Sequence, residues 1–188
     1  KVVRLKDNQN KDKSAHYCIG GLNCSAQRKR VIMHFASRQA MDIDGLGEKI
    51  INQLIDNNIV RTSADLFHLN IISLANLERM ADISASNLIA AIENSKHTTL
   101  ERFIFALSIP LVGETTANDL AKFFGNLNGL MRAHPQTLRY FPSIDNQKAI
   151  SISRFFEEPH NQEVITQLKR AGLSWNESNK GKINTRKN

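Results

Sequence analysis

The sequence has 188 residues, of which 41% are hydrophobic, and its 25 basic and 18 acidic side chains give a formal charge of +7. It contains no long apolar run and no apolar leader at its start, so we expect neither a membrane span nor a secretory signal, and we expect a cytoplasmic address. The charge attracts polyanions. Nucleic acid is favoured over an acidic membrane surface, because the basic residues are scattered and do not line one helix face.

The N-terminal stretch contains two cysteines in a polar setting. Residues 1–14 are charge-mixed, and we expect them to be a linker or a domain edge. Cys18 and Cys24 are too few for a disulfide scaffold, so the pair indicates metal ligation or no function at all. His16 could add a ligand, but a lone histidine beside a cysteine is more often a surface residue.

From residue 27 onward the apolar residues recur at helical spacing, in short segments broken by Gly, Asn, Ser and Pro. Sustained alternation with a period of two residues is absent there. The pattern predicts an all-α body. Residues 176–188 have few large hydrophobic side chains and are expected to be a polar linker.

The body repeats itself with a period of 34, 32 and 32 residues, in units anchored at Gly47, Ala81, Gly113 and Asp145. We number these units 1 to 4. The residues four before, one before, four after and seven after each anchor are all apolar. They are Ile43, Leu46, Ile51 and Leu54; Leu77, Met80, Ala85 and Leu88; Ile109, Val112, Ala117 and Leu120; and Phe141, Ile144, Ala149 and Ile152. The spacing predicts a helix, a tight hairpin and a second helix, repeated four times.

The hairpin of unit 1 has the sequence Asp44-Gly45-Leu46-Gly47. Glycine permits positive φ and lets another backbone approach closely, and the following helix presents unpaired N–H groups at its positive end. This arrangement predicts a phosphate site, assisted by Lys49. Binding would be independent of base sequence and sensitive to salt. The alternative is a tight inter-helix turn without a ligand, which is common in helical bundles.

Unit 3 strengthens the prediction of phosphate binding, because it repeats the glycine at Gly113 and adds hydroxyl groups at Thr115 and Thr116. Two sites about one repeat apart suit a duplex. A side chain at Gly47 or Gly113 is expected both to strain the turn and to block the phosphate. Arg28 and Arg30, from the only basic cluster, are further candidates for contact with the DNA backbone.

Units 2 and 4 lack the anchor glycine and carry Ala81 and Asp145 instead. A carboxylate at Asp145 would repel a phosphate unless it caps its own helix. We therefore expect the fourth hairpin to be chiefly structural, and phosphate contact by the second is in doubt.

Several motifs in fixed order resemble bacterial NAD-dependent DNA ligases, in the zinc-finger and helix-hairpin-helix segments of that family. The resemblance runs from about residue 16 to residue 175. The motifs are HYCIGGLNCSAQRKR, HFASRQAMDIDGLGEKIINQL, ADLFHL, LERM, ERFIFALSIPLVGETTANDLAKFFG and RFFEEPHNQEVITQLKRAGL. The chain departs from the family at Ala81, Ser143 and Asp145, where glycine is usual, and at Ile83, where a basic residue is usual.

The resemblance implies a fragment that grips the duplex backbone around a nick during DNA replication and repair. Its partner would be double-stranded DNA, preferably nicked, and it would act as a monomer in the bacterial cytoplasm, near the nucleoid. It implies a division into a partial four-cysteine zinc finger (1–27), a helix-hairpin-helix domain (28–175) and a linker (176–188). Cys18 and Cys24 would be the second cysteine pair of the zinc site, with the first pair upstream.

The resemblance also implies that the parent enzyme seals nicks by forming phosphodiester bonds, with NAD and magnesium bound by other domains. We expect no catalytic residue on this chain. Asp42 and Asp44 could imitate a catalytic carboxylate pair, but residues before a helix more often serve as caps and turn formers. The remaining alternatives are a stand-alone helix-hairpin-helix repair module, which would not need the cysteine pair, and a helical scaffold that binds a protein.

Overall fold

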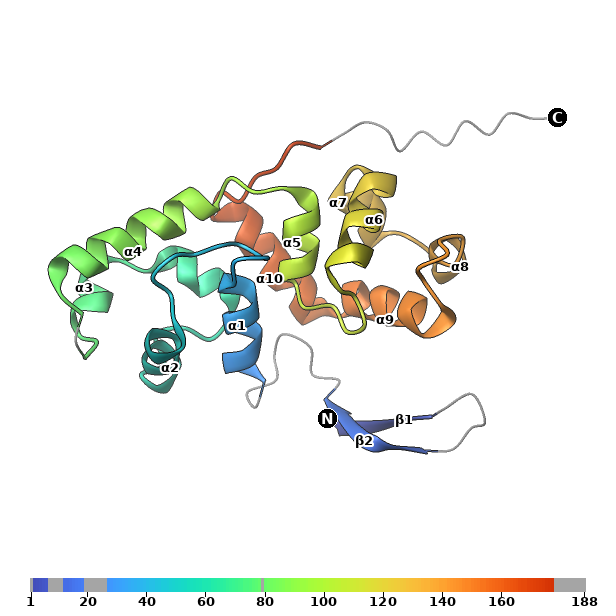
Figure 1. Ribbon diagram of the computed structural model, residues 1–188, viewed down its shortest axis with the longest axis horizontal. Coiled ribbons are helices and arrows are strands. Elements are labelled where there is room, and N and C mark those ends of the chain that lie inside the picture. Colours follow the sequence, from blue (N-terminus) through green and yellow to red (C-terminus); the bar gives the residue numbers. More distant parts are fainter. Residues whose placement is uncertain (1, 7–11, 19–26, 79, 178–188) are drawn as a thin grey trace.

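The computed structural model describes residues 2–6, 12–18, 27–78 and 80–177 (Figure 1). Strands β1 (Val2–Lys6) and β2 (Asp12–Cys18) pair antiparallel, with Val2 opposite Cys18 and an irregularity in register between Arg4 and Lys6. Part of the stretch that we expected to be a linker is therefore a hairpin. The adjacent residues Val2 and Val3 of β1 favour an extended backbone. The polar residues around them hide this local preference in the sequence.

The body that follows is helical, as predicted, in the part of it that the structure describes. Its helices are α1 (Arg28–Ala36), α2 (Glu48–Asp56), the 3₁₀ helix η2 (Ser63–His68), α3 (Ile71–Ala75), α4 (Asp82–Ser95), α5 (Leu100–Ala106), α6 (Glu114–Phe124), α7 (Leu127–Met131), α8 (Pro135–Leu138), α9 (Asn146–Glu157) and α10 (Pro159–Arg170).

The four anchor residues of the repeat are the N-caps of α2, α4, α6 and α9, which confirms the predicted register. All eight side chains four and seven residues after an anchor are exposed by 2% or less, because these positions share the inner face of each helix. Of the positions before the anchors, Met80, Val112 and Phe141 are half-buried and the others are buried. The apolar pattern is therefore the inner face of each unit.

The units associate in two pairs through side chains six residues after the anchor. In the first pair, Gln53 of α2 accepts a hydrogen bond from the backbone N–H of Glu78 at 2.7 Å. In the second pair, Asp119 of α6 accepts from the Ser143 hydroxyl at 2.9 Å. The Ser151 hydroxyl of α9 donates back to the Pro110 carbonyl at 2.7 Å. Unit 1 thus binds the hairpin of unit 2, and units 3 and 4 each bind the other's hairpin.

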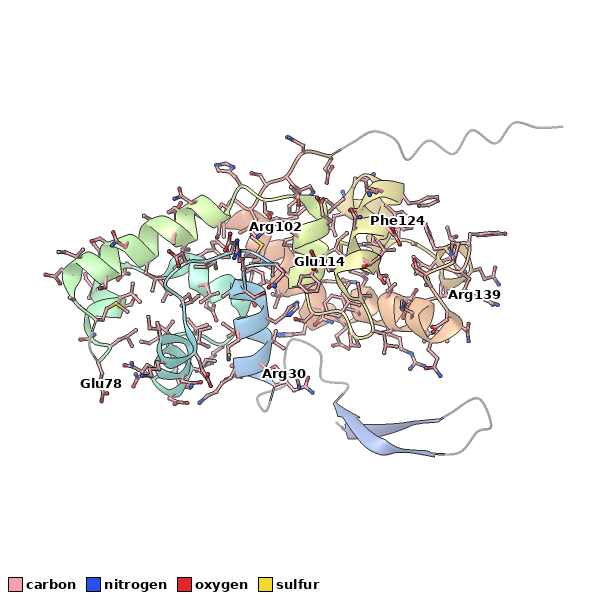
Figure 2. All side chains as sticks on the ribbon, viewed as in Figure 1. Arg30, Glu78, Arg102, Glu114, Phe124 and Arg139 are labelled. Carbon is pink, nitrogen blue, oxygen red and sulfur yellow. The ribbon has the colours of Figure 1, made fainter. Side chains whose placement is uncertain are left out.

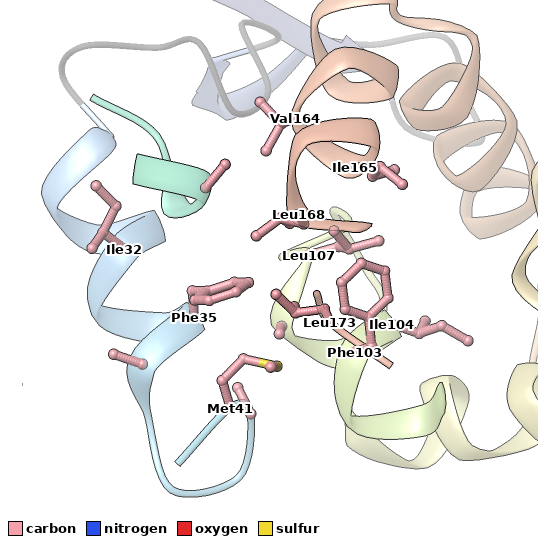
Figure 3. Close-up of a cluster of buried hydrophobic side chains, with 14 of the residues drawn as sticks. Ile32, Phe35, Met41, Phe103, Ile104, Leu107, Val164, Ile165, Leu168 and Leu173 are labelled. Carbon is pink, nitrogen blue, oxygen red and sulfur yellow. The ribbon is translucent and has the colours of Figure 1, made fainter. Parts of the chain in front are cut away.

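The two pairs meet at a shared apolar core, to which α1, α5 and α10 contribute (Figure 3). Phe35, Phe103, Leu107 and Leu168 are exposed by 1% or less. Burying a leucine or phenylalanine side chain in this way stabilises a fold by roughly 1.5–3 kcal/mol relative to leaving it in water. The junction between the pairs is therefore held by ordinary core packing.

The segment after α10 returns to the connection between α4 and α5. Gly172 has a φ of 101°, a left-handed conformation that turns the chain. The Ser174 N–H then donates to the Lys96 carbonyl at 2.8 Å, and the indole of Trp175 stacks on Phe103 with ring centroids 4.5 Å apart. The chain is anchored as far as Trp175, just before the predicted linker, most of which lies outside the described residues.

Candidate nucleic-acid interface

The hairpins of units 1 and 3 have the same backbone geometry. Hairpin 1 spans residues 42–47 and hairpin 3 spans residues 108–113. In each, the first and fourth residues are left-handed: Asp42 (φ 54°) and Gly45 (φ 80°), and Ser108 (φ 54°) and Leu111 (φ 69°). Hairpin 4 (residues 140–145) contains no left-handed residue, and neither do the described residues of hairpin 2 (residues 76–81). The glycine-anchored units are therefore distinct in shape as well as in sequence.

Local interactions hold hairpin 1 in this conformation. The Asp44 carboxylate accepts a hydrogen bond from the Gly45 N–H at 3.0 Å, and the Leu46 N–H donates to the Ile43 carbonyl at 3.3 Å. Ile43 and Leu46 are buried, whereas Asp44 and Gly47 are exposed. The apolar residues thus fasten the turn to the core and leave its polar tip in solvent.

Gly47 and Gly113 are N-caps of α2 and α6, and no side chain caps either helix. The expectation that a side chain at these positions would strain the turn is wrong. Gly47 (φ −81°) and Gly113 (φ −94°) have extended backbones that any residue can adopt, and a Cβ at either position would meet nothing within 4 Å. Among the glycines of these two hairpins, only Gly45, with its positive φ, is favoured as glycine by its conformation. The space in front of both helix ends is open.

Each of these helices begins with an exposed carboxylate, Glu48 in α2 and Glu114 in α6. A carboxylate in the first turn interacts favourably with the helix dipole and partly offsets its positive end. The next residue differs between the units: it is the exposed Lys49 in α2 and the exposed Thr115 in α6. Hairpin 1 therefore combines backbone N–H donors with a cation, and hairpin 3 combines them with a hydroxyl group.

Three other predicted site residues lie differently. Thr116 is only 6% exposed, so its side chain faces the core and only its backbone N–H could meet a ligand. Arg28 and Arg30 lie in the first turn of α1, where the adjacent Lys29 pairs with Asp56 at 3.0 Å. Figure 2 labels Arg30 on this helix. Asp56 ends α2, and Gly47 is at its other end, about 13 Å away along the axis. The two arginines are not clustered with the tip of hairpin 1.

Hairpin 4 closes its own helix end. The Asp145 carboxylate accepts a hydrogen bond from the Lys148 N–H at 2.7 Å, and the Lys148 ammonium donates to the Ser143 carbonyl at 2.6 Å. Two groups that could meet a phosphate, the backbone N–H and the ammonium of Lys148, are thus engaged internally. Hairpin 2 lies between these two cases. As in hairpins 1 and 3, no side chain caps the following helix, α4, at its N-cap Ala81. The first turn of α4, however, carries the apolar Ile83, whose side chain is 77% exposed.

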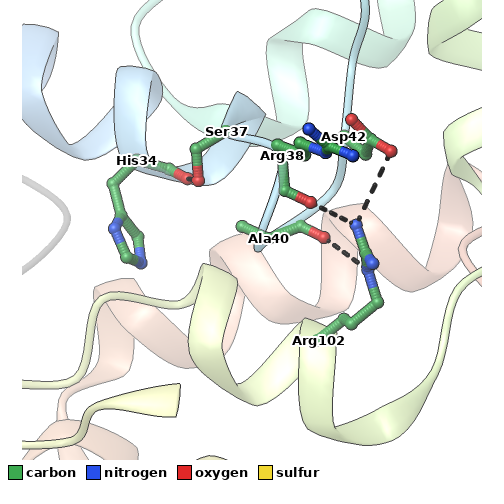
Figure 4. Close-up of polar contacts among 6 residues, drawn as sticks. All are labelled: His34, Ser37, Arg38, Ala40, Asp42 and Arg102. Atoms are coloured by element: carbon green, nitrogen blue, oxygen red, sulfur yellow. Dashed lines mark hydrogen bonds and ion pairs between the residues drawn. The ribbon is translucent and has the colours of Figure 1, made fainter.

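Sequence reasoning missed Arg102, which joins the two pairs of units. From α5, its Nε donates to the Ala40 carbonyl at 2.8 Å and its Nη2 donates to the Arg38 carbonyl at 2.6 Å (Figure 4). The Asp42 carboxylate lies 3.9 Å from the guanidinium. The loop that leads to hairpin 1 is therefore tied to the helix that leads to hairpin 3. No local sequence signal could reveal a contact between residues 62 apart.

Little of the predicted zinc site lies within the described residues. Cys24 lies outside the described residues, and of Cys18 only its backbone place at the end of β2 is described. The chain has two cysteines, whereas a closed structural zinc site needs four ligands, so the two cysteines alone could not complete such a site. Elsewhere, the described side chains form no group of three or more metal-binding residues. Among the described residues no helix is long and apolar enough to span a membrane.

Residues 102–165 match the family model of the helix-hairpin-helix motif, which covers units 3 and 4. The chain is 50% identical over 176 residues to a DNA ligase of Alkalilimnicola ehrlichii, and the match covers 94% of this chain and 25% of that protein. It is 51% identical over 174 residues to DNA ligases from two strains of Acidithiobacillus ferrooxidans, covering 93% of this chain and 25% of each relative. The chain thus spans about a quarter of the length of these relatives. The aligned part of this chain is similar to one segment of these DNA ligases, and residues 102–165 within it match the helix-hairpin-helix motif.

Proposed function

We propose that this chain is the part of an NAD-dependent DNA ligase that holds the duplex by its sugar-phosphate backbone around a nick. The observation that carries the proposal is the shared geometry of hairpins 1 and 3. Both place an exposed glycine N-cap, without a capping side chain, in front of open space. The relatives named DNA ligase support DNA as the ligand, and the net charge of +7 supports a polyanion.

In this account, the first backbone N–H groups of α2 and α6 donate hydrogen bonds to phosphate oxygens. A glycine at the N-cap allows the phosphate to approach because no Cβ stands in the open space. Lys49 adds a positive charge at hairpin 1, and the Thr115 hydroxyl adds a donor at hairpin 3. These contacts position the protein on the strand and read no base, so affinity should not depend on sequence.

The role of the chain in nick sealing would be to hold, and not to react. One phosphate site lies in the pair formed by units 1 and 2, and the other lies in the pair formed by units 3 and 4. Together they would hold the duplex across the junction between the two pairs. In the longer protein, NAD and magnesium would serve the nucleotidyl transfer outside the matched segment. Cys18 and Cys24 would contribute two of the four thiolates of a structural zinc site. We expect the chain itself to act as a monomer.

The proposal is tested by fluorescence anisotropy of the purified chain with a nicked duplex, an intact duplex of the same sequence and a nicked duplex of unrelated sequence. We expect equal binding to the two nicked sequences and weaker binding to the intact duplex. The logarithm of the association constant should fall linearly with the logarithm of salt concentration, by about 0.9 for each phosphate neutralised. Absence of binding at low salt, or affinity that is independent of salt, would contradict the proposal.

A protein-binding scaffold is the second candidate, and one observation favours it. The described part of units 1 and 2 exposes three isoleucines: Ile71 by 48%, Ile72 by 78% and Ile83 by 77%. Isoleucine in water is unfavourable unless a partner covers it. If the chain were a scaffold, neither the parent chain nor an Ile72→Ser, Ile83→Ser double variant would bind DNA. In the DNA-binding account, the parent chain binds duplex.

A further inference from the structure

Leu111 combines two unfavourable features at the tip of hairpin 3. Its φ of 69° lies in the left-handed region, where the Cβ of an L-residue is crowded by the following carbonyl. Half of its accessible surface, 50%, also remains in water. Its neighbour Ile109 is buried and already fastens the hairpin to the core. The fold therefore gains little from a large apolar side chain at this position.

The repeat shows what the fold alone requires here. The equivalent residue of hairpin 1 is Gly45, which adopts a φ of 80° without steric cost. A Cβ at Gly45 would meet the Leu88 side chain at 3.9 Å, an ordinary contact, so space alone does not exclude a side chain there. The turn needs a left-handed residue, and glycine satisfies it. The leucine in hairpin 3 therefore calls for an explanation outside the folded chain.

The position of Leu111 indicates what would cover it. The residue lies two positions before Gly113, the N-cap at which the proposed phosphate binds. Along a DNA strand, the group next to every phosphate is a deoxyribose, which presents a C–H surface. Apolar protein side chains can pack against such a surface without reading the base.

We propose that Leu111 is a DNA-contacting residue that packs against the deoxyribose next to the phosphate held at the start of α6. This inference rests on the proposed function and adds to it an apolar contact beside the electrostatic ones. Because burial of apolar surface releases no counterions, its contribution to affinity is independent of salt. The contact is also independent of sequence, because every nucleotide carries the same sugar.

Three substitutions at Leu111 test the contact in a salt-titrated duplex-binding assay. Leu111→Gly removes the side chain and is expected to weaken binding roughly three- to thirtyfold at every salt concentration, leaving the salt slope unchanged. Leu111→Met keeps an apolar side chain and should bind like the parent. Leu111→Lys places a cation beside the strand and should steepen the salt slope by about 0.9.

Asn58→Gly is the matched control. Asn58 is also left-handed, with a φ of 56°, and is exposed after α2, away from the hairpin tips. Its replacement changes the backbone in the same way as Leu111→Gly and should leave binding unchanged. For both variants, relief of the left-handed conformation is offset by the greater chain entropy of glycine, so the melting temperature should change little.

The outcomes separate this inference from the proposed function. Parent-like affinity of Leu111→Gly, or an unchanged salt slope for Leu111→Lys, overturns the deoxyribose contact and leaves the phosphate contacts standing. Equal losses in Leu111→Gly and Asn58→Gly also overturn it, because backbone relaxation would then explain both. Failure of the parent chain to bind any duplex overturns the proposed function, and this inference with it.

Discussion

Arg102 donates a hydrogen bond from its Nε to the carbonyl oxygen of Ala40, 62 residues earlier, at 2.8 Å. A second bond, from Nη2 to the Arg38 carbonyl, uses the other arm of the same planar group. α5 leads into hairpin 3, and the loop with Ala40 leads into hairpin 1. Beside the core packing, the guanidinium therefore adds a polar link that helps to fix how the two glycine-anchored hairpins lie relative to each other.

We expect Arg102→Ala to lower the free energy of unfolding by roughly 1–3 kcal/mol, because two carbonyl groups lose their hydrogen-bond donor. This value allows for the partial exposure of the Arg102 side chain to solvent. Duplex affinity should fall as well, because the spacing of the two phosphate sites is no longer fixed. Arg102→Lys keeps the charge but cannot make both bonds, so it should show most of both losses. Urea denaturation and anisotropy measure the two effects. Arg132→Ala, at an exposed position, is the control for lost charge, and a loss of the same size there would refute the positioning role.

Gly47→Val and Gly113→Val test the open space in front of α2 and α6. Both glycines have backbone angles that valine can adopt, and a Cβ meets nothing nearby, so each variant should still fold. Each should lose only the modest stability by which glycine exceeds valine as an N-cap. The added side chain should block the phosphate and weaken duplex binding by roughly ten- to a hundredfold. Circular dichroism and anisotropy check the two statements. Folded variants that bind like the parent would show that neither helix end holds a phosphate.

Ala81→Gly asks the converse question of hairpin 2. Glycine is a better N-cap than alanine, so the helix should be no less stable after the change. If the Cβ of Ala81 keeps a phosphate away from α4, the variant should bind duplex more tightly than the parent. Ala90→Gly, at an exposed position within the same helix, should lower stability by about 1 kcal/mol without raising affinity. Unchanged binding by Ala81→Gly would mean that hairpin 2 does not face the DNA.

Asp145→Ala removes the cap of α9. The carboxylate accepts the Lys148 N–H at 2.7 Å, and the loss of such a cap costs about 1 kcal/mol of stability. Duplex binding should stay the same or improve slightly, because a negative charge near the strand is gone. Thermal unfolding and anisotropy on the same preparation give both numbers. A clear drop in affinity in a folded variant would show that hairpin 4 binds DNA although Asp145 caps the start of α9.

The repeat could be predicted from sequence because each unit buries the same helix face. The anchors at Gly47, Ala81, Gly113 and Asp145 all proved to be N-caps, and this follows from apolar residues four and seven positions later. A helical period depends on residues close together in the chain. It is therefore visible without knowing how the units pack.

What the sequence could not provide depends on distant contacts or on unfavourable conformations. The Arg102 bonds join parts of the chain whose proximity is set by the core between the pairs. The left-handed angles of Ser108 and Leu111 occur in residue types that rarely adopt them, so residue type did not indicate them. Burial of Thr116 was likewise hidden, because a threonine after a glycine N-cap resembles an exposed donor.

The central claim concerns backbone N–H groups at two helix ends, and NMR titration of the amide-labelled chain with nicked duplex observes them directly. The account predicts that the amide resonances of residues 48–50 and 114–116 shift on addition of DNA. Those of residues 146–148, at the end capped by Asp145, should move much less. Shifts concentrated at residues 146–148, with residues 48–50 and 114–116 unmoved, would contradict the assignment of hairpins 1 and 3 as the phosphate sites.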